Sequence, residues 1–203
     1  MFYEPSKGHG LPHDPFKALV APRPIGWIST RAPDGTLNLA PYSYFNALST
    51  RPYLVWFSSE GSKDSHNLAA ETGEFVANIV GRELAEKMNA TSIDAPRGVS
   101  EFAIAGLTPA PSVLVAPPRV AEAPAALECK VTEIFRPKGL DGREAGAVVT
   151  VGEVVGIHIA DEFLTGGLFD SLKAGNVARL GYLDFSSVED VFSMRRPHWS
   201  ERK

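Results

Sequence analysis

Short apolar segments of β type recur along the 203 residues of this chain, and turn-forming residues separate them. Residues 32–35 read Ala-Pro-Asp-Gly, a turn in which Pro presets φ and Gly tolerates positive φ, so the segments on either side are expected to form a hairpin. The expected strands are, in chain order, 25–30, 36–40, 54–57, 74–80, 126–135 and 147–159.

Two short helical patterns interrupt these strands. Residues 64–72 place a capping residue ahead of helix formers and stop at Gly73, and residues 82–89 carry apolar side chains on one stripe. Strands and helices do not alternate in the βαβ manner that gives a doubly wound sheet. The pattern therefore predicts a mainly β fold, a β-barrel with helical decoration.

Length and composition are typical of one globular domain spanning residues 1–203, with 44% hydrophobic and 22% charged residues. Residues 1–15 lack periodicity and are expected to form an arm that packs on a partner subunit, and residues 183–203 are expected to form a tail. The net charge of -4 gives no basic field that would attract nucleic acid or an anionic membrane. No apolar run approaches about 18 residues and no signal peptide is recognisable, so we expect a cytoplasmic protein without a membrane segment.

The single cysteine, Cys129, excludes an internal disulfide and every multi-cysteine zinc or iron–sulfur site. Charged neighbours flank it in a β pattern, so its side chain is expected to pack inward as a small hydrophobe without a redox role. The five histidines show no metal-ligand spacing either. We therefore expect no metal site.

Five sequence blocks follow one another along the chain. They are RPIGWIST at 23–30, NLAPYSYFNALS at 38–49, KDSHN at 63–67, EFVAN at 74–78 and GVSEF at 98–102. In this order they resemble the flavin reductase-like family, of the flavoredoxin type, and the resemblance extends over about residues 13–154. It implies an FMN-binding split β-barrel, Greek-key-like in topology, with non-covalently bound FMN and redox chemistry.

The start of the first helical pattern offers donors for the FMN phosphate. Lys63, Asp64 and Ser65 stand where unpaired backbone N–H groups and the helix dipole favour an anion. Lys63 adds charge, Ser65 adds a hydroxyl, and Ser59 and Ser62 lie just upstream. Asp64 or Ser65 could instead merely cap the helix, but Lys-Asp-Ser here resembles the phosphate end of the family.

Residues 42–49 alternate irregularly between small polar side chains and aromatics, which is unusual for a strand. An irregular backbone beside a ligand would explain this pattern. Ser43 and Asn46 could reach the phosphate and ribityl chain, while Tyr44 or Phe45 could border the isoalloxazine ring. Each aromatic taken singly is equally consistent with a core position.

Residues Trp27, Ile28, Ser29 and Thr30 resemble the strand that runs along the isoalloxazine in the family. The resemblance implies that backbone amides and the Ser29 or Thr30 hydroxyl face the ring. Trp27 is also consistent with a core position.

His158 is the candidate catalytic residue. It lies in the last long β pattern, on the face opposite Ile157 and Ile159, where it could meet the nicotinamide or substrate side of the flavin. The alternative is a surface or hydrogen-bonded strand histidine. Arg179 stands in a block similar to one of the family's, but its glycine-poor continuation leaves a cofactor contact open.

The expected chemistry is hydride transfer, which needs no protein acid or base at the reacting atom because the flavin accepts the hydride. In agreement, no catalytic triad, paired-carboxylate signature, Walker-type loop or G-x-G-x-x-G fingerprint is visible. We expect a homodimeric FMN reductase that uses NAD(P)H and passes electrons to an acceptor or a partner oxygenase. The alternatives are a flavoredoxin-like electron carrier with tightly bound FMN, and a non-catalytic flavin-binding or storage protein.

Overall fold

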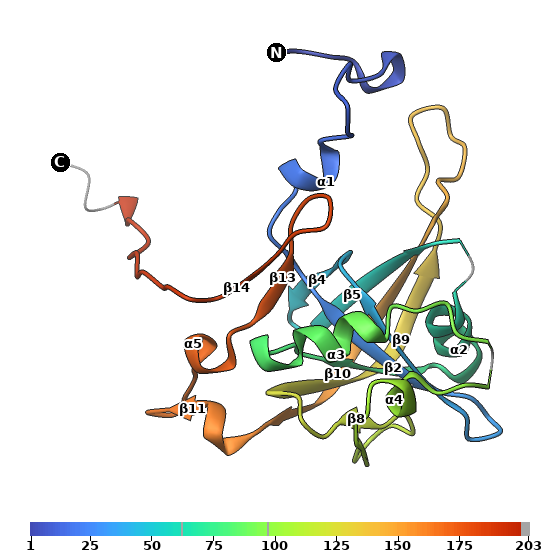
Figure 1. Cartoon of the computed structure of the whole chain (residues 1–203), viewed down its shortest axis with the longest axis vertical. Coiled ribbons are helices and arrows are strands. Elements are labelled where there is room, and N and C mark those ends of the chain that lie inside the picture. The colour runs from blue at the N-terminus through green and yellow to red at the C-terminus, as the bar shows by residue number, and fades with distance from the viewer. Residues whose placement is uncertain (62, 97, 200–203) are drawn as a thin grey trace.

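A seven-stranded antiparallel sheet forms the body of the molecule in the computed structural model, which describes residues 1–61, 63–96 and 98–199 (Figure 1). Its strand order is β3-β2-β6-β9-β10-β5-β4, and it curls into a half-barrel, which confirms the mainly β, barrel-like prediction. The strands are β2 (Gly26–Arg31), β3 (Leu37–Tyr42), β4 (Phe45–Thr50), β5 (Tyr53–Glu60), β6 (Glu74–Asn78), β9 (Ala125–Phe135) and β10 (Ala147–Ile159).

Short elements surround this sheet. The α-helices are α1 (Phe16–Leu19), α2 (Asp64–Thr72), α3 (Ala85–Ala90), α4 (Glu101–Ile104) and α5 (Ser171–Ala174). The 3-10 helices are η1 (Pro5–Lys7), η2 (Arg82–Leu84) and η3 (Asp161–Phe163). The remaining strands are β1 (Arg23–Pro24), β7 (Pro109–Ala110), β8 (Arg119–Val120), β11 (Leu164–Thr165), β12 (Leu168–Phe169), β13 (Val177–Arg179) and β14 (Phe185–Ser187), of which β1, β13 and β14 form a second small sheet. Among the described residues, no helix is long and apolar enough to span a membrane.

The predicted strands and helices are present with small shifts at their ends. The hairpin of β2 and β3 turns at residues 32–35, and α2 ends at Gly73, whose φ of 73° is the left-handed conformation that glycine tolerates. The expectation of an irregular backbone over 42–49 is confirmed in part. Ser43 and Tyr44 bend, and from Phe45 the chain forms the edge strand β4, which pairs with β5 except at an irregularity between Ala47 and Ser49.

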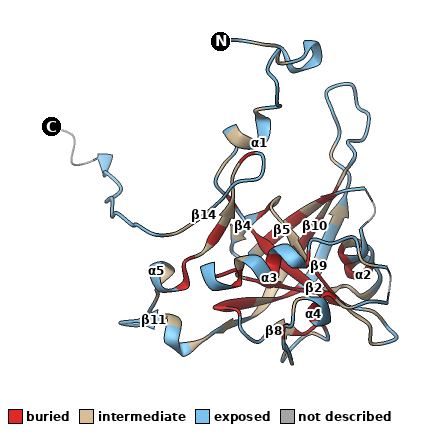
Figure 2. Cartoon of the chain, in the orientation of Figure 1, coloured by how far each residue is buried: buried red, intermediate tan, exposed pale blue. Residues whose placement is uncertain are grey.

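The two faces of the sheet belong to two hydrophobic clusters. Successive β2 residues point to opposite faces, so Trp27 packs in one cluster and Ile28 in the other (Figure 2 shows β2 buried). The Ile28 face also contacts Ala69 of α2 and the buried Cys129. Burial raises the pKa of the Cys129 thiol, in agreement with the inert, inward-packed role expected for it.

The face of the sheet that carries Trp27 is covered by the proline-rich connector, residues 107–121. The buried Glu128 carboxylate accepts hydrogen bonds from the backbone N–H groups of Val113 and Leu114, at 2.8 and 2.6 Å. Ser29 donates its hydroxyl to the Pro118 carbonyl at 2.6 Å. Buried polar side chains of the sheet therefore hold the connector in place.

The N-terminal arm and the tail leave the body separately, as Figure 1 shows. Where α1 passes the segment before the tail, the buried guanidinium of Arg23 donates to the carbonyls of Lys17 and Val20 and to that of Leu180. Beyond this joint, apolar side chains such as Phe2 and Phe192 are exposed. Of the predicted tail, residues 200–203 lie outside the described residues, as does Ser62 of the predicted phosphate end.

Gly152 permits close packing of the sheet core. A Cβ atom there would lie 2.5 Å from Phe75 Cε1, and Phe75 is fully buried against Phe57. We therefore expect Gly152→Ala to lower the free energy of unfolding by about 1–3 kcal/mol through overpacking, measured by thermal and urea denaturation. Gly146→Ala is the matched control, since nothing lies within 4 Å of its Cβ position. Equal stability of the two variants would contradict this account of the core.

Candidate functional site

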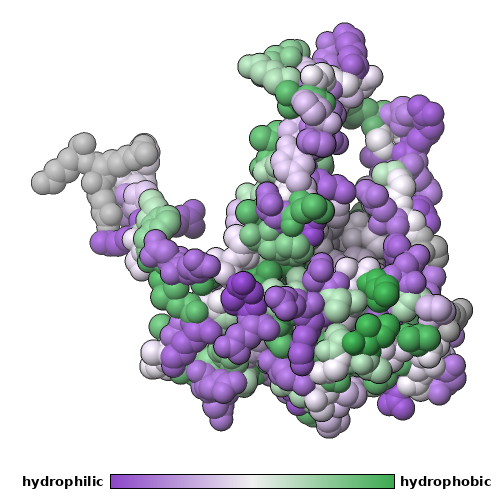
Figure 3. Space-filling model, in the orientation of Figure 1, coloured by the Kyte–Doolittle hydropathy of each residue, from purple (hydrophilic) through white to green (hydrophobic). Residues whose placement is uncertain are grey.

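A cleft of about 380 Å³ opens at the N-terminal end of α2. Its walls come from β3, the bend at Ser43 and Tyr44, the end of β5, the first turn of α2, and the loop after α3. Of the predicted site residues it brings together Ser43, Tyr44, Ser59, Lys63, Asp64 and Ser65. The space-filling view shows the surface hollowed between the N-terminal arm and the hairpin loop that joins β9 to β10 (Figure 3).

The start of α2 presents donors that no side chain within the described ranges satisfies. Lys63 is the N-cap residue, has extended backbone angles, and makes no side-chain capping bond. Asp64 and Ser65 are the first two helical residues, so neither is the capping residue that the alternative interpretation required. The first backbone N–H groups of a nine-residue helix therefore point out of its end beside the cleft.

Lys63 is the cation nearest to this helix end. Its side chain is about half exposed, and its ammonium lies 3.9 Å from the Asp94 carboxylate on the loop after α3. A second lysine, Lys17 of α1, also lines the cleft, and Arg23 donates a hydrogen bond to its carbonyl. Because Glu60, Asp64, Asp94 and Glu101 line it as well, the net charge of the cleft does not favour an anion. An anion would depend on directed donors rather than on the overall field.

The bend between β3 and β4 places Ser43 and Tyr44 in the cleft, whereas Phe45 and Asn46, which follow, do not line it. Ser43 and Tyr44 line the cleft, and the Arg23 guanidinium lies 5.9 Å from the centre of the Tyr44 ring. Phe45 is instead a core residue, 7% exposed, whose ring fills the space above Gly26. Asn46 is exposed on the edge strand, and its side-chain oxygen accepts from the Ala47 N–H. The predicted ligand contacts of Phe45 and Asn46 therefore have no counterpart in the cleft.

The β2 residues lie inside the protein. Trp27, Ile28 and Ser29 pair with β3 on one side and β6 on the other, so the backbone groups there belong to the sheet. Trp27 and Ser29 point to the face of β2 opposite Ile28, where the Ser29 hydroxyl donates to the Pro118 carbonyl. The Trp27 indole donates to Oγ1 of Thr91, a residue of the cleft wall, at 2.9 Å. Ile28 is fully buried, and Thr30 accepts a hydrogen bond from Asn38. The backbone groups of Trp27, Ile28 and Ser29 are paired on both sides and are not available to a flavin, whereas Thr30 pairs with β3 only, so its predicted contact stays a prediction.

His158 also lies on the face opposite the cleft. Its Nε2 is 2.5 Å from Glu128 Oε1, the carboxylate that holds the connector. Burial alone raises the pKa of Glu128, but the hydrogen bonds from His158, Val113 and Leu114 outweigh it, so the pKa is lowered. This favours the alternative of a hydrogen-bonded strand histidine.

The sequence analysis did not identify Asn38 and Tyr42 of β3 as cleft residues, although the period-two alternation of a strand would have placed them on one face. Asn38 and Tyr42 lie on the same face of β3, separated by four residues, and both line the cleft. A third missed residue, Glu101 at the start of α4, is buried beside them, and its carboxylate accepts from the Leu39 N–H at 2.9 Å. Burial raises the pKa of Glu101 above its ordinary value.

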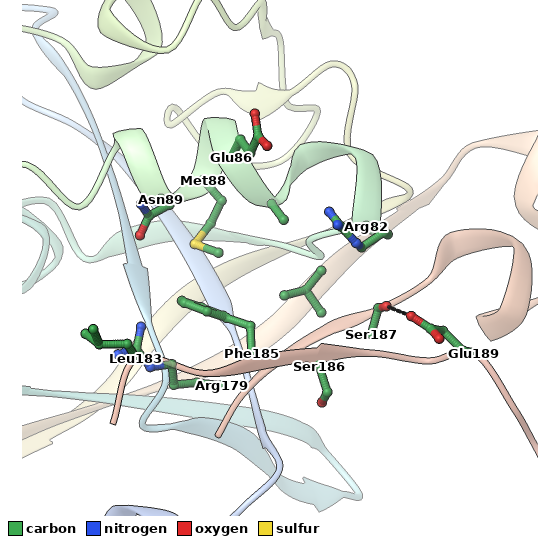
Figure 4. A pocket seen from close by; sticks show the side chains of 12 residues that line it. Arg82, Glu86, Met88, Asn89, Arg179, Leu183, Phe185, Ser186, Ser187 and Glu189 are labelled. Carbon is green, nitrogen blue, oxygen red and sulfur yellow. Dashed lines mark hydrogen bonds between the residues drawn. The ribbon is translucent and has the colours of Figure 1, made fainter. Parts of the chain in front are cut away.

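A larger hollow, of about 670 Å³, lies between α3 and the strands β13 and β14 (Figure 4). Arg179 lines it, with its guanidinium 4.3 Å from the centre of the Phe185 ring. None of the predicted cofactor-binding residues lines this hollow. The cleft at α2 is therefore the better candidate, and the contact with Phe185 accounts for Arg179 without a cofactor.

Comparison with known proteins agrees with the resemblance of the sequence blocks. The model of the flavin reductase like domain matches residues 19–172. A relative from Halalkalibacterium halodurans is 35% identical over 189 residues, which cover 91% of this chain and 90% of the relative.

Solved structures share the fold over nearly the whole chain. Nitrilotriacetate monooxygenase component B from Bacillus cereus is 28% identical with a TM-score of 0.86, covering 96% of this chain and 98% of that one. A split-barrel protein from Shewanella frigidimarina, whose name describes a flavin reductase, has a TM-score of 0.80 at 22% identity, covering 90% of both chains. The chain therefore belongs to the flavin reductase-like domain family and is a flavin-related oxidoreductase with the split-barrel fold.

Proposed function

We propose that this protein binds FMN in the cleft at α2 and uses NAD(P)H to reduce it, passing the electrons to an acceptor or a partner oxygenase. One observation carries the proposal: the start of α2, whose N-cap residue Lys63 makes no side-chain capping bond, lines a single cleft together with Ser43 and Ser59 in a flavin reductase-like chain. The likeness to the component B of a monooxygenase supports an oxygenase as the final acceptor.

The phosphate of FMN fits the α2 end of the cleft. The first-turn N–H groups of α2 supply directed donors that do not depend on the net charge of the cleft, and Lys63 supplies a charge-assisted contact. Ser59 is buried near the end of β5, and its hydroxyl donates to the Gly61 carbonyl at 3.2 Å. These residues would hold the phosphate and fix the position of the remainder of the flavin.

The chemistry that FMN supplies when bound is the acceptance of a hydride from a reduced nicotinamide. The chain's own residues then have to bind and orient the cofactor and exclude water. Tyr44, at the bend after β3, is the aromatic side chain placed to border the ring system, and the Arg23 guanidinium beside it keeps its orientation.

A homodimer is part of this proposal. Strand β4 is one edge of the half-barrel, and Asn46, Ala47 and Leu48 on it are exposed. The arm and the tail carry further exposed apolar side chains, including Phe2 at 87% and Phe192 at 82% exposure. Proteins cover such edges and patches, and a second copy of the chain would do so here.

The role of Lys63 can be tested by titration. We expect Lys63→Ala to raise the dissociation constant for FMN about tenfold, because a charge-assisted contact to phosphate is lost, while the apoprotein melts like the wild type. Fluorescence quenching of FMN measures the affinity, and Lys130→Ala, an exposed lysine on β9, is the control. Equal affinity of wild type and Lys63→Ala would remove Lys63 from the site.

Reduction by pyridine nucleotide is tested by rapid mixing of the FMN-loaded protein with NADH or NADPH. We expect the absorbance of the oxidised flavin at about 450 nm to fall within a single turnover as the flavin is reduced. His158→Asn should bleach at the wild-type rate, because its side chain lies on the other face of the sheet. The absence of bleaching with both nucleotides would favour a storage protein. A slower reduction rate in His158→Asn, with unchanged FMN affinity, would return His158 to the active site.

Gel filtration tests the remaining alternative. If FMN stays bound through gel filtration, and added free flavin does not stimulate NAD(P)H oxidation, the flavoredoxin-like carrier is favoured.

The dimer is tested by light scattering at micromolar concentration. We expect a mass twice that of the chain, and we expect Leu48→Glu on the exposed edge strand to shift the mass toward that of one chain, because it places a charge on the apolar surface that a partner would cover. A single-chain mass for the wild type would argue against a dimer.

A further inference from the structure

Arg23 is a buried cation whose hydrogen-bond partners are all neutral. The residue is 7% exposed, and its guanidinium donates to the backbone carbonyls of Lys17, Val20 and Leu180. Within residues 1–61, 63–96 and 98–199, no carboxylate forms an ion pair with it. Buried charges in proteins are usually paired with an opposite charge, because an uncompensated one costs free energy. The position of Arg23 therefore needs a reason beyond packing.

The hydrogen bonds of this guanidinium are also incomplete. The Nε atom of Arg23 is buried and has no hydrogen-bond partner among the residues that the structure describes. Most buried donors have an acceptor, so each exception requires an explanation. Three neutral carbonyls and one unpaired N–H leave the positive charge of the guanidinium only partly balanced by the protein.

The charge stands directly behind one wall of the cleft at α2. The Arg23 guanidinium carbon lies 5.9 Å from the centre of the ring of Tyr44, which lines the cleft. Lys17, whose carbonyl accepts a hydrogen bond from Arg23, is a second lining residue. Because Arg23 is buried, its field is less screened than that of an exposed lysine. The field therefore reaches the part of the cleft that Tyr44 borders.

In the proposed function Tyr44 borders the ring system of the flavin, whose charge changes in the reaction. Hydride transfer breaks a C–H bond of the reduced nicotinamide, which leaves as the oxidised pyridinium, and forms a bond to hydrogen on the flavin. The hydride carries two electrons and one proton, so the ring system gains one negative charge. We propose that the buried charge of Arg23 stabilises the anionic ring system of the reduced flavin and so raises its reduction potential.

This inference rests on the proposed function and deepens it, because it names a residue that sets the driving force for reduction. Arg23 acts across the Tyr44 ring without touching the reacting atoms, so its role is electrostatic rather than catalytic. Lys63 differs in this respect. The phosphate that it would contact has the same charge in both oxidation states, so Lys63 contributes equally to the binding of oxidised and reduced FMN.

The test measures the midpoint potential of FMN bound to the full chain by spectroelectrochemical titration. Because the four carboxylates that line the cleft act in the opposite direction, the comparison is between variants. We expect Arg23→Gln to lower the affinity for reduced relative to oxidised FMN about tenfold, which lowers the midpoint potential of this two-electron couple by about 30 mV. Arg31→Gln, at the exposed end of β2, is the matched control and should not change it. Equal potentials of wild type and Arg23→Gln would overturn the proposal.

Two further variants separate charge from structure. Arg23→Lys keeps the charge but loses the planar fork, so we expect a lower melting temperature with the wild-type potential, and this variant decides the matter if Arg23→Gln does not fold. A tenfold loss of relative affinity in Arg23→Lys would overturn the proposal.

Lys63→Ala should weaken the binding of both oxidation states equally and leave the potential unchanged. A shift in Lys63→Ala as large as that in Arg23→Gln would overturn the assignment to Arg23. A wild type that binds FMN in neither oxidation state would reject the proposed function itself.

Discussion

The buried guanidinium of Arg23 is the interaction on which the arrangement of the site depends. It donates to carbonyls on both sides, 2.6 Å from Val20 O and 2.7 Å from Leu180 O, and so joins a segment near the N-terminus to one near the C-terminus. A buried charge costs several kcal/mol when its hydrogen bonds are lost, so this joint resists opening. Helix α1 therefore stays where Lys17 lines the cleft, and Tyr44 stays beside the guanidinium.

The two faces of the sheet have separate roles because side chains alternate along each strand. On one face, Ser29, Asn78 and Glu128 are occupied in holding the connector at 107–121. On the other face, Asn38 and Tyr42 meet α2 and the cleft. A polar residue within the flavin reductase-like sequence blocks therefore indicates a cofactor contact only when its side chain is known to point to the cleft face of the sheet.

Local patterns predicted the parts of the fold that local interactions determine. Period-two alternation identified β9 and β10, and Gly73 marked the end of α2. Strand β4 was missed because its formation depends on pairing with β5 rather than on its own composition. Within the site, the helix start and Lys63 followed from sequence order, whereas the partner of His158 is Glu128, thirty positions away on a neighbouring strand. Such contacts depend on register, which a single sequence does not specify.

The strand order also has a consequence for folding. The pairs β2–β3, β4–β5 and β9–β10 are neighbours in sequence and can form as local hairpins. The pairing of β5 with β10 instead joins residues near 60 to residues near 147. One edge of β5 therefore remains unpaired until β10, the last long strand, has been synthesised. During that interval β5 is unprotected against pairing with other chains. The last long strand, rather than the motif-bearing first half, thus completes the sheet and ends this exposure.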